Sequence, residues 1–180
     1  MRSILGMTLL GVILLGCSPV PNKTEGKAVL EAEVQEAIAL FKQADPEIQR
    51  FFNESAGYAV IPKIFKGAVL VGGAYGKGRL YENGQMTGYC SLSQGTLGFS
   101  FGGEFFREII FFHRSVDVTL FKWEEFTLSA QATAVAMTAG AAAKTDYRDG
   151  MAVFVMADSG LMVDASIGGQ KFNFIPLDLQ

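Results

Sequence analysis

Residues 57–90 read GYAVIPKIFKGAVLVGGAYGKGRLYENGQMTGYC, short runs of Val, Ile, Leu and Tyr separated by glycines. Such β-branched and aromatic runs favour strands, and glycines within them suit bulges, bends and close backbone approach. Asn83-Gly84 lies between two of the runs and indicates a two-residue hairpin, because a type I′ turn requires positive φ at both central residues. This stretch therefore predicts antiparallel strands in a strongly curved sheet.

Strand-like patterns continue through most of the later chain, bounded by glycines or polar turns. The expected strands are Tyr58–Ile61, Ala68–Tyr75, Gly78–Tyr81, Gln85–Cys90, Thr96–Phe101, Phe105–His113, Met151–Ala157, Leu161–Ile167 and Lys171–Phe174. Ser115 is expected to cap a short helix between two of them. Five apolar residues of that helix are expected to face the core, namely Val116, Val118, Leu120, Phe121 and Trp123. Residues 128–143 are almost wholly small and apolar, which suits either a helix or a strand.

A helical period precedes the strands. From Lys27 to Lys42 the apolar residues recur at three- and four-residue intervals with glutamates between them, which is typical of an amphipathic helix. Asp45-Pro46 then supplies an N-cap and a proline suited to the first helical position, so a second short helix is expected to end before Gly57. Residues 27–180 thus predict one α+β domain, an N-terminal helical hairpin packed on a curved, mostly antiparallel β-sheet or barrel.

The beginning of the chain has the pattern of a secretory signal. Arg2 precedes an apolar stretch, residues 4–15, that is shorter than the roughly 20 residues a transmembrane helix needs. Leu14-Leu15-Gly16-Cys17 resembles the bacterial lipobox, in which the cysteine receives a diacylglyceryl group. We expect residues 1–16 to be removed and Cys17 to become the lipid-bearing N-terminus. The alternative is an incidental cysteine within an ordinary secretory signal.

Residues 17–26 are expected to form a lipidated tether, because they are polar and contain two prolines. Ser18 stands where aspartate marks inner-membrane retention in enteric bacteria, and it favours the outer membrane. The sequence thus predicts a lipid-anchored domain that faces the periplasm.

Composition excludes several classes of partner. The chain has 15 basic and 18 acidic residues, a net charge of −3, and loss of Arg2 would make it more acidic. This balance argues against nucleic acid, whose binding requires a surplus of positive charge. Cys90 is the one thiol left once Cys17 is acylated, so no intrachain disulfide is expected and Cys90 should be a small buried residue.

Motifs for catalysis or metal binding are weak. The glycine-rich segment 72–78 lacks the Ser or Thr that follows the lysine of a phosphate loop. His113 is the sole histidine, which excludes a multi-histidine metal site and suits a core or strand-end imidazole. The acidic pairs Glu124-Glu125 and Glu104 with Glu108 are expected on solvated faces or at helix ends. We therefore expect no enzyme activity, no cofactor and no metal.

A cluster of positive charge stands out in this acidic chain. Lys63, Lys66, Lys77 and Arg79 lie within one hairpin-sized region, and Phe65 is interleaved with them. Basic side chains beside an exposed ring suit an anionic lipid headgroup, because cations neutralise phosphate while the ring lies in the interfacial layer. An ordinary solvated loop is an equal alternative from the residues alone.

Several ordered motifs resemble the SYLF domain, a lipid-binding module also found in eukaryotic actin-patch proteins. They are GYAVIP at 57–62, KGAVLVGGAYGKG at 66–78, SQGTLGFSFGG at 93–103 and DSGLMVDASIGG at 158–169. The resemblance covers roughly residues 28–174. It implies phospholipid binding without catalysis, and it favours a strand over a helix in residues 128–143.

Together these observations predict a membrane-anchored envelope lipoprotein that binds anionic phospholipid, with Lys63, Lys66, Lys77 and Arg79 as the headgroup ligands. Phosphoinositides are not expected in a bacterial envelope, and the SH3 domain of many eukaryotic members is absent. The alternative is a non-catalytic envelope scaffold that uses the same surface for a protein, peptidoglycan or another lipoprotein.

Overall fold

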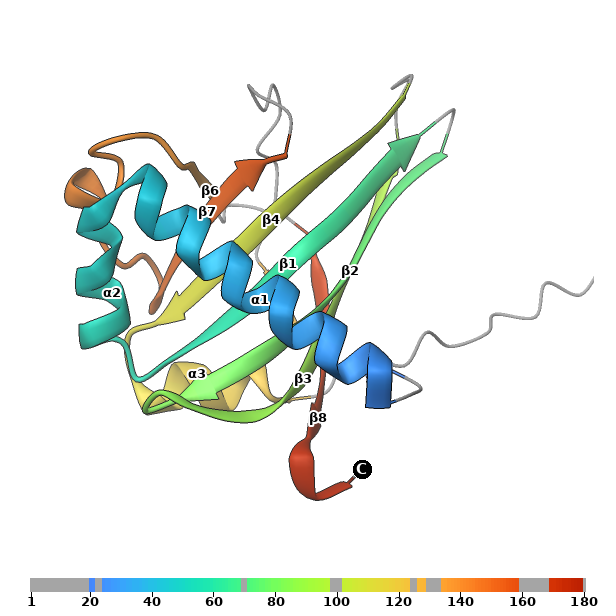
Figure 1. Cartoon of the computed structure of the whole chain (residues 1–180), viewed down its shortest axis with the longest axis horizontal. Helices are drawn as coiled ribbons and strands as arrows, with labels where there is room; N and C mark the ends of the chain where they lie inside the picture. The colour runs from blue at the N-terminus through green and yellow to red at the C-terminus, as the bar shows by residue number, and fades with distance from the viewer. Residues whose placement is uncertain are drawn as a thin grey trace, which may run out of the picture.

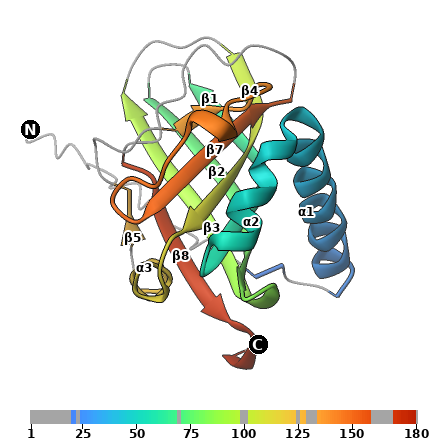
Figure 2. The same ribbon diagram turned by 90° about the vertical axis from the view of Figure 1, so that its left-hand side faces the viewer.

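The computed structural model describes residues 20–21, 24–68, 71–97, 102–123, 126–128, 134–158 and 169–179. It is an α+β fold in which an N-terminal helical segment is followed by an eight-stranded sheet. Figure 1 shows helix α1 (Thr24–Ala44) lying diagonally across the sheet, and Figure 2 shows that α1 and α2 (Gln49–Glu54) cover the same side of it. The sheet curls into a half-barrel.

The helical segment consists of α1 (Thr24–Ala44), a 3₁₀ turn η1 (Pro46–Ile48) and α2 (Gln49–Glu54). α1 begins three residues before Lys27, where the amphipathic pattern was expected to start. The expected cap at Asp45 is confirmed, since its Oδ1 accepts a hydrogen bond from the backbone N–H of Glu47 at 3.1 Å. The capped element is the 3₁₀ turn, which leads directly into α2.

The strands are β1 (Gly57–Ala68), β2 (Val71–Glu82), β3 (Gln85–Leu97), β4 (Gly102–Phe112), β5 (Phe126–Thr127), β6 (Ala134–Ala136), β7 (Met151–Ala157) and β8 (Lys171–Pro176). Their order in the sheet is β5-β8-β3-β2-β1-β4-β7-β6. All neighbouring pairs are antiparallel except β6 and β7, so the mostly antiparallel prediction is confirmed.

The predicted hairpin at Asn83-Gly84 joins β2 to β3. Both residues have positive φ, 49° and 77°, as the two-residue turn requires. The strands on either side are longer than expected. β2 joins most of the run Ala68–Tyr75 to the run Gly78–Tyr81, and β3 extends the run Gln85–Cys90 as far as Leu97. Because these paired strands are long, the sheet can curl along its length.

Two hydrophobic cores lie on the two faces of the sheet. One packs α1 and α2 on the outer face and includes Phe41, Phe51, Phe111 and Phe154. The other fills the inner face and joins residues from strands far apart in the sheet order, such as Val153 of β7 and Phe172 of β8. Since both of these strands contribute to one cluster, the inner core lies on the concave side of the curl.

Close backbone approach explains one of the glycines. The pairing of β1 with β2 shifts register between Val60 and Lys63, as in a β-bulge. A Cβ added to Gly76 on the facing strand would lie 2.7 Å from a methyl of Ile61 and 2.8 Å from a side-chain carbon of Ile64. The inner face can therefore be packed at the bulge only because residue 76 has no side chain.

Helix α3 (Ser115–Phe121) is present where a helix was expected, but its N-cap is Arg114 and not Ser115, and its orientation corrects a further part of the prediction. Val118 and Phe121 are buried in the inner core as expected. The prediction was wrong for Val116, Leu120 and Trp123, whose side chains are exposed. Only one stripe of this seven-residue helix faces the core, so Val116 and Leu120 face outward, and Trp123 lies beyond the end of the helix.

Residues 128–143 contain only a short strand, β6, in the part that the structure describes, followed by the 3₁₀ turn η2 (Ala142–Lys144). The strands expected at Met151–Ala157 and Lys171–Phe174 are confirmed as β7 and β8. The expected strand Leu161–Ile167, the signal segment and Cys17 lie outside the described residues.

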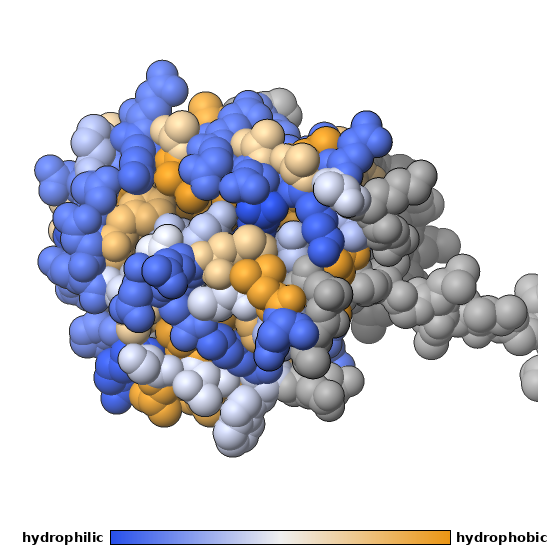
Figure 3. Space-filling view, turned by 60° about the horizontal axis from the view of Figure 1, so that its bottom comes forward, coloured by the Kyte–Doolittle hydropathy of each residue, from blue (hydrophilic) through white to orange (hydrophobic). Residues whose placement is uncertain are grey.

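Hydrophobic residues also reach the surface. On the face drawn in Figure 3, they form patches between hydrophilic residues. Among the helices that the structure describes, none is both long enough and apolar enough to cross a bilayer.

Candidate functional site

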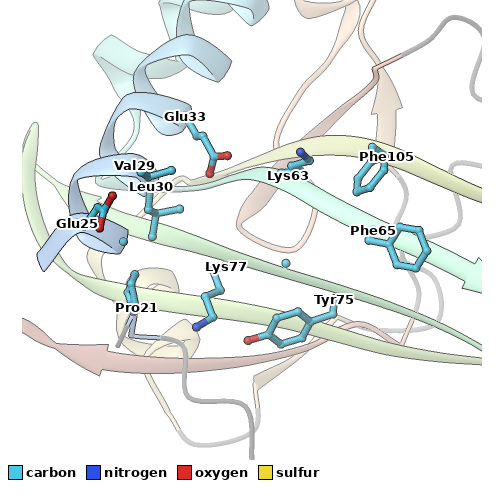
Figure 4. Close-up of a pocket in the computed structure, with 12 residues that line it drawn as sticks. Pro21, Glu25, Val29, Leu30, Glu33, Lys63, Phe65, Tyr75, Lys77 and Phe105 are labelled. Atoms are coloured by element: carbon cyan, nitrogen blue, oxygen red, sulfur yellow. The ribbon is translucent and has the colours of Figure 1, made fainter. Parts of the chain in front are cut away.

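A groove lies between the N-terminal half of α1 and the outer face of β1, β2 and β4. Its volume is about 680 Å³. Figure 4 shows α1 contributing Glu25, Val29, Leu30 and Glu33, with Lys63 and Lys77 projecting from the strands below. Strand alternation turns odd-numbered residues at the ends of β1, β2 and β4 toward this groove.

Much of the groove is apolar. Phe65 and Phe105 are cross-strand partners whose ring centroids lie 5.2 Å apart, and they are 49% and 40% exposed. Val29 on α1 is 52% exposed, whereas its neighbour Leu30 is buried. Large apolar side chains that remain this exposed in a groove mark a surface suited to an apolar ligand.

Two of the four predicted cations line the groove. Lys63 and Lys77 are cross-strand partners in β1 and β2. The Lys63 ammonium lies 4.9 Å from the ring centroid of Phe105, within the range of a cation–π contact. The Lys77 ammonium donates a hydrogen bond to the backbone oxygen of Val20 at 3.4 Å, at the end of the groove where α1 begins. The groove therefore carries positive charge beside its aromatic pair.

Lys66 lies elsewhere. Because successive side chains of a strand point to opposite faces, Lys66 and its cross-strand partner Glu104 lie on the face opposite Phe65 and Phe105. The Lys66 ammonium is 3.7 Å from a carboxylate oxygen of Glu104. The structure does not bring Lys66 into the groove.

Arg79 is placed beneath α1. The residue is only 4% exposed, and its guanidinium pairs with the Glu31 carboxylate at 3.1 Å. It also donates to the backbone oxygen of Lys27 at 2.8 Å and lies over the ring of Tyr89. The contacts with Glu31 and Lys27 join α1 to the sheet, so Arg79 acts as an anchor of the helix.

A polar recess of about 220 Å³ adjoins the groove and was missed by sequence reasoning. It is lined by Glu33, Glu36, Ala37, Pro62, Lys63, Arg107 and Asp158. Glu33 and Lys63 line both hollows, so the recess continues from the groove. The three-residue spacing of Glu33 and Glu36 on α1 was the available signal, but it could not say which strand side chains the two carboxylates face.

The inner core holds a buried carboxyl group, which corrects the expectation that Glu108 is solvated. Glu108 of β4 is fully buried, and its Oε2 accepts a hydrogen bond from Gln170 Nε2 at 3.1 Å. Burial raises the pKa of Glu108 to about 8, although the bond from Gln170 opposes the rise. Burial also raises the pKa of the nearby Cys90 thiol, and the Glu108 charge adds to this. Cys90 is buried as expected, and neither group reaches the groove.

His113 occupies the expected strand end. It is exposed just after β4, and its ring stacks on Tyr147 with centroids 4.5 Å apart. Burial raises the pKa of Tyr147 to about 12. Within the described ranges, no group of three or more His, Cys, Asp or Glu residues is placed to hold a metal ion.

Comparison with known proteins does not assign the chain to a family. No family model matches the chain. The chain is similar to Beta cell expansion factor A of Aeromonas veronii, with 26% identity over 137 residues, which is 75% of this chain and 51% of that protein. The chain spans about half the length of this curated relative, whose name refers to beta cells and to no ligand. The groove between α1 and the sheet is the candidate functional site.

Proposed function

We propose that the protein is a membrane-anchored envelope lipoprotein whose SYLF-like domain, residues 27–180, binds phospholipid in the groove beneath α1. The observation that carries this proposal is the placement of Lys63 and Lys77 beside the exposed pair Phe65 and Phe105. The apolar part of the groove takes acyl chain, and the two ammonium groups take the anionic phosphodiester. The proposal is one of binding and assigns no catalytic step.

The free energies expected for apolar burial and for charge pairing agree with placing the acyl chain on the apolar part of the groove and the phosphodiester at the lysines. Each square ångström of apolar surface removed from water contributes roughly 25 cal/mol, so acyl chain on Val29, Phe65 and Phe105 supplies most of the free energy of binding. A lysine near an anionic lipid surface contributes on the order of 1 kcal/mol. The two lysines therefore select for phosphate more than they add affinity.

A covalent anchor fits the same proposal. We also propose that residues 1–16 are removed, that Cys17 is acylated, and that the domain faces the periplasm from the outer membrane. In this proposal α1 and α2 form a helical hairpin over the sheet. A lipid on Cys17 would hold the domain at a high effective concentration over the bilayer, so weak groove binding would suffice. A Cys17→Ala variant is expected to leave the detergent phase in phase separation, and unchanged partitioning would exclude the anchor.

Charge removal in the groove tests phospholipid binding. The double variant Lys63→Gln/Lys77→Gln is expected to bind short-chain phospholipid at least tenfold more weakly in calorimetric titration, at about 1 kcal/mol for each charge. Lys66→Gln is the matched control, because Lys66 belongs to the same cluster but lies on the opposite face. Equal losses in both variants would show that overall charge, and not the groove, governs binding.

The alternative is a non-catalytic envelope scaffold that binds a protein or peptidoglycan through the same surface. Mass spectrometry of lipids that copurify with the protein separates the two. Phospholipid retained by the wild type and lost in Lys63→Gln/Lys77→Gln supports lipid binding. A protein that carries no lipid and shows no titration with phospholipid would favour the scaffold.

A further inference from the structure

We propose that the polar recess beside the groove selects a zwitterionic headgroup with a primary ammonium, so that the ligand is a phosphoethanolamine lipid. This inference rests on the proposed phospholipid binding and specifies the headgroup. Its basis is the recess shared between α1, β1, β4 and the end of β7, which continues the groove at Glu33 and Lys63.

In the part of the chain that the structure describes, some charged side chains of the recess pair with each other, and others have no charged partner. Arg107 and Asp158 form an ion pair with each other, and the Arg107 side chain is 16% exposed. Among the described residues, neither Glu33 nor Glu36 forms an ion pair or a side-chain hydrogen bond. The recess thus offers two carboxylates to a ligand cation, and Lys63 is the cation that it shares with the groove.

Placement of these charges matches the order of groups in the headgroup. A phosphate between Lys63 and Lys77 lies at the groove, as the proposed function requires. The two-carbon arm that follows the phosphate then leads past Lys63 into the recess, toward Glu33 and Glu36. Figure 4 shows Glu33 projecting from α1 toward the side of the groove on which Lys63 lies. A primary ammonium carries three N–H donors and satisfies both carboxylates.

Other common headgroups fit these charges less well. Phosphoglycerol brings no cation for Glu33 and Glu36, so the two carboxylates would face the phosphate region of the ligand without a partner of their own, and like charges at close range repel. A choline ammonium has no N–H donor and is bound by aromatic cages in proteins. The described residues that line the recess include no aromatic side chain. The recess therefore favours ethanolamine over both glycerol and choline.

Three soluble probes test the inference with the full chain. Dihexanoyl phosphatidylethanolamine, phosphatidylglycerol and phosphatidylcholine share their acyl chains and phosphate and differ only in the headgroup. Calorimetric titration is expected to show phosphatidylethanolamine bound at least fivefold more tightly than either of the others. In Glu33→Gln/Glu36→Gln this preference is expected to disappear, while phosphatidylglycerol binds as well as before or better. Glu47→Gln removes one exposed carboxylate from η1, outside the recess, and is the matched control.

The outcomes separate this inference from the function on which it rests. Phosphatidylglycerol bound as tightly as phosphatidylethanolamine, or equal binding of phosphatidylcholine, would overturn the headgroup assignment and leave phospholipid binding intact. A preference that persists in Glu33→Gln/Glu36→Gln while circular dichroism shows a folded variant would also overturn it. Binding of none of the three probes by the wild type would overturn both proposals.

Discussion

Glu108 shows at the residue scale how one buried polar group couples the fold to pH. Its Oε2 accepts a bond from Gln170, whereas Glu108 Oε1 and Gln170 Oε1 have no hydrogen-bond partner among the described residues. Both atoms are acceptors, so they can form a hydrogen bond with each other only if the Glu108 carboxyl group carries a proton. A neutral carboxylic acid also avoids the cost of burying a charge among apolar side chains.

Stability is expected to fall as pH rises because the folded pKa of Glu108 is about 8, above its ordinary value of 4.5. Between these values the folded state binds more protons than the unfolded state. The contribution of protonated Glu108 to the free energy of unfolding is therefore complete below about pH 4.5. It is lost as pH rises from there through 8, by up to about 1.4 kcal/mol for each pH unit. Urea denaturation from pH 5 to 9 measures the loss. Glu108→Gln is expected to lack it, and parallel pH profiles for the two proteins would contradict this origin.

Arg79 and Lys63 are predicted to differ although both are basic residues of neighbouring strands. Arg79→Gln is expected to lower the free energy of unfolding by about 1–3 kcal/mol, because Glu31 and the Lys27 carbonyl lose a buried charged donor. Lys63→Gln is expected to change it by less than about 0.5 kcal/mol, since Lys63 is exposed. Urea denaturation compares the two variants. Equal effects would show that Arg79 does not anchor α1.

At the scale of elements, local signals explain most of what the sequence predicts correctly. The Asn83-Gly84 turn, the Asp45 cap and the strands at Met151–Ala157 and Lys171–Phe174 depend on neighbouring residues, and each is present. The burial of Glu108 and the exposure of Val116 depend on which face an element turns inward. The curl of the sheet determines which face points inward, and the curl depends on contacts between residues distant in sequence. The groove was predictable only in part. Lys63 and Arg79 are both basic strand residues in the sequence, and only the position of α1 over Arg79 shows that Arg79 is buried and Lys63 is not.

Asp45 joins two elements, and its loss is expected to affect both. One carboxylate oxygen caps η1, and the other accepts a buried hydrogen bond from the Ala142 N–H of η2 at 2.7 Å. Asp45→Ala is expected to cost about 1–3 kcal/mol because it leaves that buried N–H without a partner. Asp45→Asn keeps one acceptor oxygen and should cost less. Thermal unfolding measures both variants, and an Asn variant as unstable as the Ala variant would contradict the acceptor role.

At the scale of the whole molecule, Cys90 reports when the inner core opens. Its thiol is fully buried, and its pKa is raised by burial and by Glu108. In a Cys17→Ser background, labelling by a thiol reagent is expected to be slow in buffer. The rate should rise with urea in proportion to the unfolded population, since the thiolate is the reactive form and is accessible only after unfolding. Fast labelling of the native protein, measured by mass spectrometry, would show that the inner core opens locally.

The two edges of the sheet have a consequence for self-association. As described, the sheet ends at β5 on one side and β6 on the other, strands of only two and three residues. An edge strand aggregates by offering unpaired N–H and C=O groups to another copy, and so short an edge offers few of them. The long strands β1 to β4 all lie inside the sheet; β8 pairs with Gly88–Ser93 of β3, and β7 pairs with Phe106–Phe112 of β4. Because its longest strands lie in the middle of the sheet, the molecule offers a neighbouring copy only short stretches of unpaired strand among the described residues.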